Sequence, residues 1–142
     1  MTLDTNRIRG KLTDIFRSLN RLKAFQGISK EEFLRNEDYQ DIARSRLLTA
    51  IEAALNICYY LAAKKIHQVP EDYSHCFELL GLSGMLPDEL AGRLSKMARF
   101  RNRLVHLYWD IDYSAVYEII CNDLKDLEDY AMEIGKFIES HG

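Results

Sequence analysis

Apolar residues recur at steps of three and four positions along four long segments of this chain of 142 residues, which is the spacing of one face of an α-helix. No segment alternates apolar and polar residues as a β-strand would. We expect the seven glycines and two prolines to lie between the periodic segments, where they would end helices and form short loops. The pattern predicts an all-α fold, an antiparallel helical bundle of four main helices plus short helices.

The helix boundaries are predicted from the residues that begin and end the periodic segments. Ser29 and Glu32 have the spacing of a capping box, in which side chains and backbone amides exchange hydrogen bonds at the start of a helix. Pro70 lacks an amide hydrogen and should end the second long helix. The expected main helices are 4–24, 38–66, one that begins at 87, and 114–139, with short helices from 29 and over 73–86.

Length and composition predict a single domain, residues 1–142. The formal net charge of -3 excludes a diffuse basic field, so any contact with nucleic acid would have to be local.

No stretch approaches the roughly 18 uncharged apolar residues that cross a bilayer, and no signal peptide is evident, so we expect a cytoplasmic protein without a membrane partner. The three widely spaced cysteines indicate neither a disulfide framework nor a zinc site, and no metal or cofactor is expected.

The segment Phe100 to Asp112, FRNRLVHLYWDID, contains an arginine in an unusual place. On a helix with about 100° per residue, Arg101 lies in the middle of an apolar stripe. The stripe residues within about 60° of it are Leu90, Leu94, Met97, Leu104, Val105 and Tyr108. A charge in that position loses hydration and needs a partner, because an uncompensated buried charge is costly. Arg101 therefore indicates chemistry or ion pairing in place of ordinary core packing.

A second stripe on the same helix is polar and consists of Ser95, Arg99, Asn102 and His106. Asn102 and His106 are four residues apart, so the amide can fix the orientation of the imidazole or hold a group bound beside it. Arg101 and His106 are about 140° apart on an ideal helix. They can bind the same phosphate only if the helix ends near His106 or a second subunit supplies one of them. We therefore expect a homodimer.

These residue types suit the cleavage of RNA without a metal ion. Histidine titrates near neutrality, so it can take the proton of a ribose 2′-hydroxyl or give one to the leaving 5′-oxygen. Arginine offers a planar set of donors that stabilises charge on a phosphate. Arg99 and Arg103 add local positive charge, and Tyr108 and Trp109 provide surfaces on which bases can stack. The structural alternative is a helical histidine with ordinary partners, solvated arginines and aromatic residues of the core.

The pattern R-x-x-x-x-H followed by x-Y resembles the signature of HEPN domains, in particular the HepT-like ribonuclease toxins of prokaryotic toxin–antitoxin systems. The stretches MARFRNRLVHLYWDID, IEAALNICYYLAAKKI and VPEDYSHCFELLGLSGML resemble that family too. The resemblance implies a homodimeric bundle in which both subunits build a metal-independent endoribonuclease site. Arg101 and His106 match the catalytic pair and Asn102 the supporting polar position. Arg99 and Arg103 are expected to add to phosphate binding.

The resemblance also implies a partner and a modification. In related systems the antitoxin is a minimal nucleotidyltransferase that transfers AMP from ATP to the tyrosine two residues after the histidine, here Tyr108. An adenylate group there would place bulk and negative charge beside Arg101 and exclude RNA. The competing interpretation is a non-catalytic binding or accessory subunit of the nucleotidyltransferase, because a shared fold does not fix activity. His67, His75 and His141 match no element of the motif.

Overall fold

The computed structural model describes residues 3–106 and 111–141, and for His106 and His141 it describes the backbone alone. These described residues form helices and turns, with no strand among them. The helices are α1 (Thr5–Lys23), α2 (Lys30–Arg35), α3 (Glu37–Leu61), α4 (Tyr73–Leu82), α5 (Asp88–His106), α6 (Tyr113–Asn122) and α7 (Leu124–His141). A 3₁₀ turn (Ala24–Gly27) follows α1, and a π-helical turn (Ala62–Ile66) extends α3.

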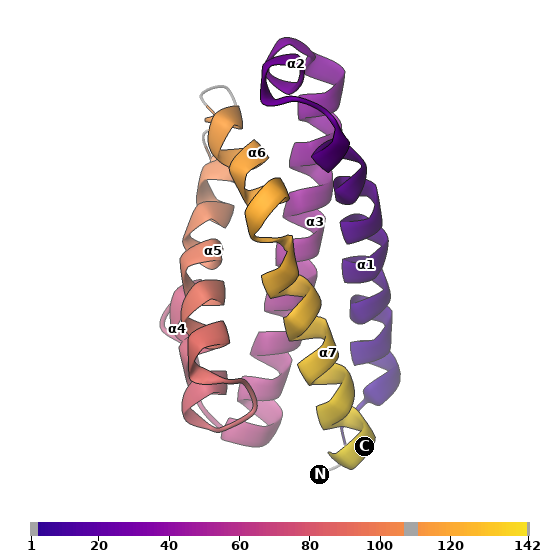
Figure 1. Cartoon of the computed structure of the whole chain (residues 1–142). Coiled ribbons are helices and arrows are strands. Elements are labelled where there is room, and N and C mark those ends of the chain that lie inside the picture. Colours follow the sequence, from indigo (N-terminus) through magenta and orange to yellow (C-terminus); the bar gives the residue numbers. More distant parts are fainter. Residues whose placement is uncertain (1–2, 107–110, 142) are drawn as a thin grey trace.

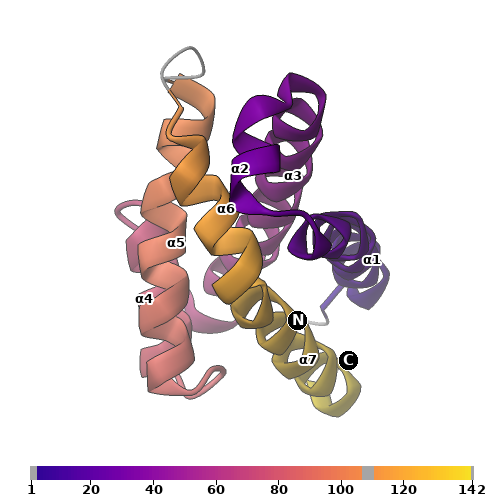
Figure 2. The ribbon, with the colours of Figure 1, turned by 45° about the horizontal axis from the view of Figure 1, so that its top comes forward.

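The long helices run alternately up and down the molecule. The chain passes up α1, down α3, up α5 and down through α6 and α7 (Figure 1). α1 packs along α3, and α4 packs along α5, while α7 contacts α1, α3 and α5. Figure 2 shows the same arrangement from a view turned toward the top of the bundle. The predicted all-α antiparallel bundle is confirmed.

Five helices begin at a residue whose side chain accepts a hydrogen bond from the backbone N–H three positions ahead. These capping residues are Asp4, Ser29, Asn36, Asp72 and Asp112. Each cap satisfies one of the amide groups that a first helical turn leaves without a partner. The start of α2 at Ser29 was predicted from its capping box, and Ser29 Oγ accepts from the Glu32 amide at 3.1 Å.

The prediction of a single helix over 114–139 is wrong in one respect, because this segment forms two helices that are separated at Asp123. Asn122 and Asp123 have poor helix propensity because their short polar side chains compete for backbone hydrogen bonds. The apolar stripe continues on both sides of the break, with Val116 in α6 and Leu127 in α7 both buried. Because periodicity persists across the break, the sequence pattern alone did not reveal it.

The expectation that glycines lie between helices is wrong at four positions. Gly10, Gly92 and Gly135 lie inside α1, α5 and α7, and Gly81 is the next-to-last residue of α4. A single glycine costs a helix only about 1 kcal/mol relative to alanine, which the tertiary packing of a long amphipathic helix can offset. Gly81 has a packing role, because a Cβ there would lie 2.7 Å from the Cβ of Ala91. Glycine at this position therefore allows α4 to approach α5 closely.

The core of the bundle fixes the orientation of α5, the helix that contains Arg101. Leu94, Ala98 and Leu104 of α5 are buried, so the opposite face of this helix is turned outward. Tyr130 of α7 is fully buried and donates its hydroxyl to the Ala54 carbonyl of α3 at 2.8 Å, which ties α7 to the centre of the bundle. Among the described residues, no helix has both the length and the apolar character needed to cross a membrane.

Candidate functional site

Arg101 lies at the edge between the buried and exposed faces of α5. Its side chain is only 18% exposed, as its place in the apolar stripe predicts. Its neighbours Asn102 and Arg103 are exposed, and so is Arg99, two residues before Arg101. The polar stripe is less uniform than expected, because Ser95 is buried and donates its hydroxyl to the Ser74 carbonyl at 3.0 Å.

The partner that Arg101 requires is Glu52 of α3. The Nη2 atom of Arg101 donates to Glu52 Oε1 at 2.9 Å, and the carbon of the guanidinium lies 5.0 Å from the centre of the Tyr73 ring. The attraction between a cation and an aromatic face adds to the ion pair. The guanidinium is thus held between α3 and the first residue of α4, in a fixed place beside the outward face of α5.

Two donor atoms of Arg101 remain weakly used or unused. Nη1 makes a long contact of 3.4 Å with the amide oxygen of Asn102. Nε is buried and has no hydrogen-bond partner among the described residues. A small cavity of about 170 Å³ opens beside this group, and Glu52, Tyr59 and Tyr73 are part of its lining. The guanidinium therefore keeps hydrogen-bonding capacity beyond what Glu52 takes up.

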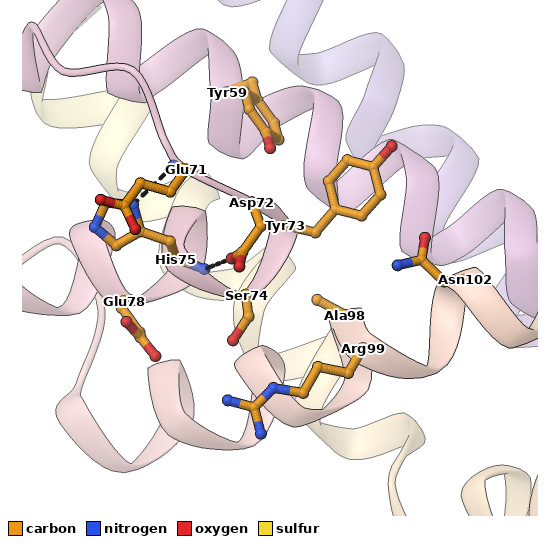
Figure 3. A pocket seen from close by; sticks show the side chains of 10 residues that line it. All are labelled: Tyr59, Glu71, Asp72, Tyr73, Ser74, His75, Glu78, Ala98, Arg99 and Asn102. Atoms are coloured by element: carbon orange, nitrogen blue, oxygen red, sulfur yellow. Dashed lines mark hydrogen bonds between the residues drawn. The ribbon is translucent and has the colours of Figure 1, made fainter.

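A larger cavity of about 510 Å³ lies between α4 and α5, and we call it the α4–α5 cavity (Figure 3). It is lined by residues 71–75 and Glu78, by Tyr59 of α3, and by Ala98, Arg99 and Asn102 of α5. Tyr73 lines both this cavity and the small one beside Arg101. Burial raises the pKa of the Tyr59 hydroxyl, so this group remains a hydrogen-bond donor at neutral pH.

The predicted site residues are placed as follows. Asn102 and Arg99 both line the α4–α5 cavity, next to Arg101, whereas Arg103 is exposed and is not part of that lining. His106 is the last described residue of α5, and its side chain lies outside what the structure describes. Tyr108 lies outside the described residues. The structure thus brings Arg99, Arg101 and Asn102 together and leaves the predicted roles of His106 and Tyr108 untested.

Three residues near the site were not predicted from the sequence. Glu52 and Tyr73 contact the Arg101 guanidinium. Arg44 of α3 donates its Nε to the Leu104 carbonyl at 3.0 Å, which places a positive charge at the carboxyl end of α5, two residues before His106. The only available signal was that Arg101 needs a counter-charge, and periodicity does not say which acidic residue supplies it.

Comparisons with known proteins agree with this fold and identify the family. A family model described as Ribonuclease HepT-like matches residues 15–134. A protein of Aphanizomenon flos-aquae (strain 2012/KM1/D3) named tRNA nuclease HepT is 30% identical over 131 residues, which cover 92% of this chain and 89% of that protein. A protein of Shewanella oneidensis named mRNA nuclease HepT is 24% identical over 123 residues, covering 87% of this chain and 92% of that protein.

A solved structure with the same fold is that of the tri-AMPylated Shewanella oneidensis HEPN toxin in complex with the MNT antitoxin. It superposes with a TM-score of 0.83 at 24% identity, over 95% of this chain and 99% of that one. At this identity the likeness supports the fold. The family model spans most of the chain, and the relative at 30% identity is matched over nearly its whole length. The chain therefore belongs to the HepT-like ribonuclease family.

Proposed function

We propose that this chain is the endoribonuclease toxin of a toxin–antitoxin pair, and that Arg101 and His106 form its catalytic site. The observation that carries the proposal is the Arg101 guanidinium, which Glu52 and Tyr73 hold in place while its Nε has no hydrogen-bond partner among the described residues. Membership of the HepT-like ribonuclease family and relatives named as tRNA and mRNA nucleases support RNA as the substrate.

The proposed reaction is an intramolecular transfer of the phosphoryl group. His106 takes the proton of the ribose 2′-hydroxyl, and the 2′-oxygen forms a bond to the phosphorus. The bond from phosphorus to the 5′-oxygen breaks, and His106 passes the proton that it took from the 2′-hydroxyl to the leaving oxygen. The products are a 2′,3′-cyclic phosphate and a 5′-hydroxyl. No step needs a metal ion, because Arg101 supplies the positive charge that stabilises the negative phosphate oxygens.

The remaining polar groups of α5 take supporting roles in this proposal. Asn102 contacts Arg101 and lines the α4–α5 cavity, so its amide orients the guanidinium or the bound phosphate. Arg99 and Arg103 are exposed on the same helix and attract the RNA backbone. Together they make a local basic surface on a chain whose formal net charge is -3.

Two copies of the chain complete the site. On an ideal helix Arg101 and His106 are about 140° apart, so a single straight α5 would turn them in different directions. A homodimer with facing α5 helices would bring the arginine of one copy to the histidine of the other. The exposed positions of Asn102 and Arg103 leave this face of α5 available for a second copy.

The proposed antitoxin is a nucleotidyltransferase that modifies Tyr108. The phenol oxygen of Tyr108 would attack the α-phosphorus of ATP, and pyrophosphate would leave. The AMPylated toxin in the Shewanella oneidensis complex supports this partner and this chemistry. Intact-mass measurement after incubation with the partner and ATP should show added adenylate groups on the native chain and none on Tyr108→Phe. Modification of Tyr108→Phe to the same extent would contradict the assignment.

RNA cleavage by the purified chain tests the proposed activity. The native protein should cut tRNA or mRNA in the presence of EDTA and leave 2′,3′-cyclic phosphate ends. Arg101→Ala and His106→Ala should each reduce the rate by at least about a hundredfold, the usual effect of losing a general acid–base or a charge-stabilising group. Circular dichroism should show the same helix content in all three. A native protein that cuts no RNA, or an active His106→Ala variant, would contradict the proposal.

A further inference from the structure

The α4–α5 cavity differs in charge from the Arg101 site beside it. The carboxylates of Glu71, Asp72 and Glu78 line it, whereas the basic side chains among its described lining residues are Arg99 and His75. None of these three carboxylates forms an ion pair with a described residue. An excess of negative charge repels phosphate and attracts hydrogen-bond donors. The cavity therefore suits a neutral group that is rich in N–H donors.

Ser74 supplies an independent indication that the cavity binds a ligand. The residue is only 8% exposed, and its Oγ has no hydrogen-bond partner among the described residues. A buried hydroxyl without a partner costs about 1–3 kcal/mol, so such groups are rare unless a ligand or water satisfies them. Figure 3 shows the Ser74 side chain among the residues that line the cavity, between those of Asp72 and Arg99.

The cavity adjoins the Arg101 site through the rings of Tyr59 and Tyr73, which also line the small cavity beside Arg101. Tyr73 lines the cavity, and the guanidinium carbon of Arg101 lies 5.0 Å from the centre of its ring. The ring of Tyr59 meets that of Tyr73 edge to face, with centroids 6.1 Å apart, and lines the same cavity. Flat aromatic surfaces are those on which unpaired RNA bases stack. A base in the cavity would thus lie next to a phosphate bound by Arg101.

We propose that the α4–α5 cavity binds the base of a nucleotide adjoining the cleaved phosphate, and that it favours bases with an exocyclic amino group. This inference rests on the proposed ribonuclease activity. The amino group donates to the Glu78 carboxylate, which belongs to the second turn of α4, and Ser74 Oγ makes a further hydrogen bond to the base edge. The base stacks against Tyr59 or Tyr73. Cytosine and guanine carry such an amino group, and uracil and hypoxanthine do not.

The remaining groups of the cavity are consistent with a base and not with a second phosphate. His75 accepts a hydrogen bond at Nδ1 from the Glu71 amide at 2.9 Å, so it presents no charge-assisted donor at that atom. Asp72 Oδ1 accepts from the His75 amide at 2.7 Å and caps α4, which fixes its carboxylate at the cavity. The cavity volume of about 510 Å³ falls in the range of small-molecule sites, roughly 300–1,000 Å³.

Mononucleotide binding to the full chain tests the cavity without relying on cleavage. Calorimetry should show that CMP binds about tenfold more tightly than UMP, which has a carbonyl oxygen where CMP has the amino group, and that GMP binds more tightly than IMP, which lacks the amino group of GMP. The preference should be lost in Glu78→Ala and weakened in Ser74→Ala. The matched control is Glu139→Ala, which removes an exposed carboxylate at the end of α7 and should keep the preference. Equal affinities within both pairs would overturn the proposal.

Cleavage of an RNA pool of random sequence gives the second measurement. Sequenced ends from the native protein should show an excess of amino-bearing bases at one position beside the cut, and Glu78→Ala should remove that excess while it still cuts. Cleavage without any such excess would overturn the base site alone. A preference among mononucleotides without cleavage would overturn the ribonuclease proposal and leave the base site standing. An unchanged preference in Glu78→Ala, with weakened antitoxin binding, would make the cavity a protein-docking surface and overturn the proposal.

Discussion

Arg101 shows how one residue can indicate a candidate site. Its place on an apolar helix face predicted that it needs a partner, and the structure supplies Glu52 at 2.9 Å and the Tyr73 ring. The Glu52 side chain is 43% exposed, so the ion pair is within reach of water and salt. The Arg101 side chain is only 18% exposed, so the pair is part-buried and also contributes to stability. Its main effect is expected on the orientation of the guanidinium.

Glu52→Ala should lower the rate of RNA cleavage by about tenfold or more, because an arginine that is no longer held loses part of its orientation toward the phosphate. Glu52→Gln should retain more activity, since its amide oxygen still accepts a hydrogen bond from the arginine. The fall should appear in kcat more than in KM. The melting temperature should fall for Glu52→Ala, which leaves the part-buried Arg101 charge without its partner, and should fall less for Glu52→Gln.

The matched control for Glu52 is Glu128→Ala. Glu128 forms an ion pair with Lys23 and has a similar exposure, 41%, but it lines neither cavity beside Arg101. Glu128→Ala should lose little stability, because both side chains of that pair are exposed, and should keep full activity. Equal activity of Glu52→Ala and Glu128→Ala would show that Glu52 does not position Arg101.

The carboxyl end of α5 is held by a contact from another helix. Arg44 of α3 donates to the Leu104 carbonyl, one of the last backbone acceptors of α5. A positive charge there also interacts favourably with the helix dipole. Because His106 lies two residues beyond Leu104, this contact fixes the backbone from which the proposed catalytic histidine extends.

Arg44→Ala should destabilise the protein by about 1 kcal/mol through the lost hydrogen bond and dipole interaction, and it should also slow RNA cleavage. Arg44→Lys keeps the charge and should recover part of both losses. Arg46→Ala, two residues along the same helix, removes the same charge and serves as the control. Urea unfolding and initial cleavage rates measure the two effects. An Arg44→Ala variant with unchanged cleavage would show that this contact does not govern the site.

At the break between α6 and α7, the surroundings of Asp123 disfavour the ionised form of its carboxyl group. Burial, and then the nearby charge of Asp126, raise the pKa of Asp123 above its ordinary value of 3.8. A raised pKa in the folded state means that the protonated form is favoured by folding. The contribution of Asp123 to the free energy of unfolding is therefore fully present below pH 3.8, and it is lost as the pH rises through the raised pKa.

Asp123→Asn should therefore raise the melting temperature at pH 7, where the native carboxylate is ionised at a cost. The difference between variant and native protein should shrink as the pH falls toward the ordinary pKa of 3.8. Asparagine keeps the low helix propensity of this position, so the break itself should remain. Thermal unfolding across this pH interval measures the effect. A difference that does not depend on pH would rule out ionisation as its cause.

Much of the fold was predictable because helical periodicity reports burial directly. The stripes that contain Ile15, Ile51 and Ile134 gave the long helices and their inward faces, and these residues are buried. The break at Asp123 and the internal Gly92 were not predictable from that pattern. Packing of the neighbouring helices tolerates both, and it depends on contacts between residues far apart in the chain.

The candidate site was predictable only where one helix carries it. Arg99, Arg101 and Asn102 follow from the phase of α5, and the structure places them together. Glu52 and Ser74 come from other helices, 49 and 27 positions before Arg101, and no local pattern connects them to it. The α4–α5 cavity exists only because α4 packs closely on α5, which no periodicity describes.

The central claim is that Arg101 of one copy and His106 of another act on the same phosphate. Mixing the two inactive variants Arg101→Ala and His106→Ala, after brief unfolding and refolding together, tests it directly. Each mixed dimer would contain one intact Arg101–His106 pair in place of the two pairs of a native dimer. Because about half of the dimers would be mixed, RNA cleavage should return to about a quarter of the native rate. Mass spectrometry of the intact complexes confirms the exchange. No recovered cleavage in confirmed mixed dimers, or cleavage by either variant alone, would contradict the claim.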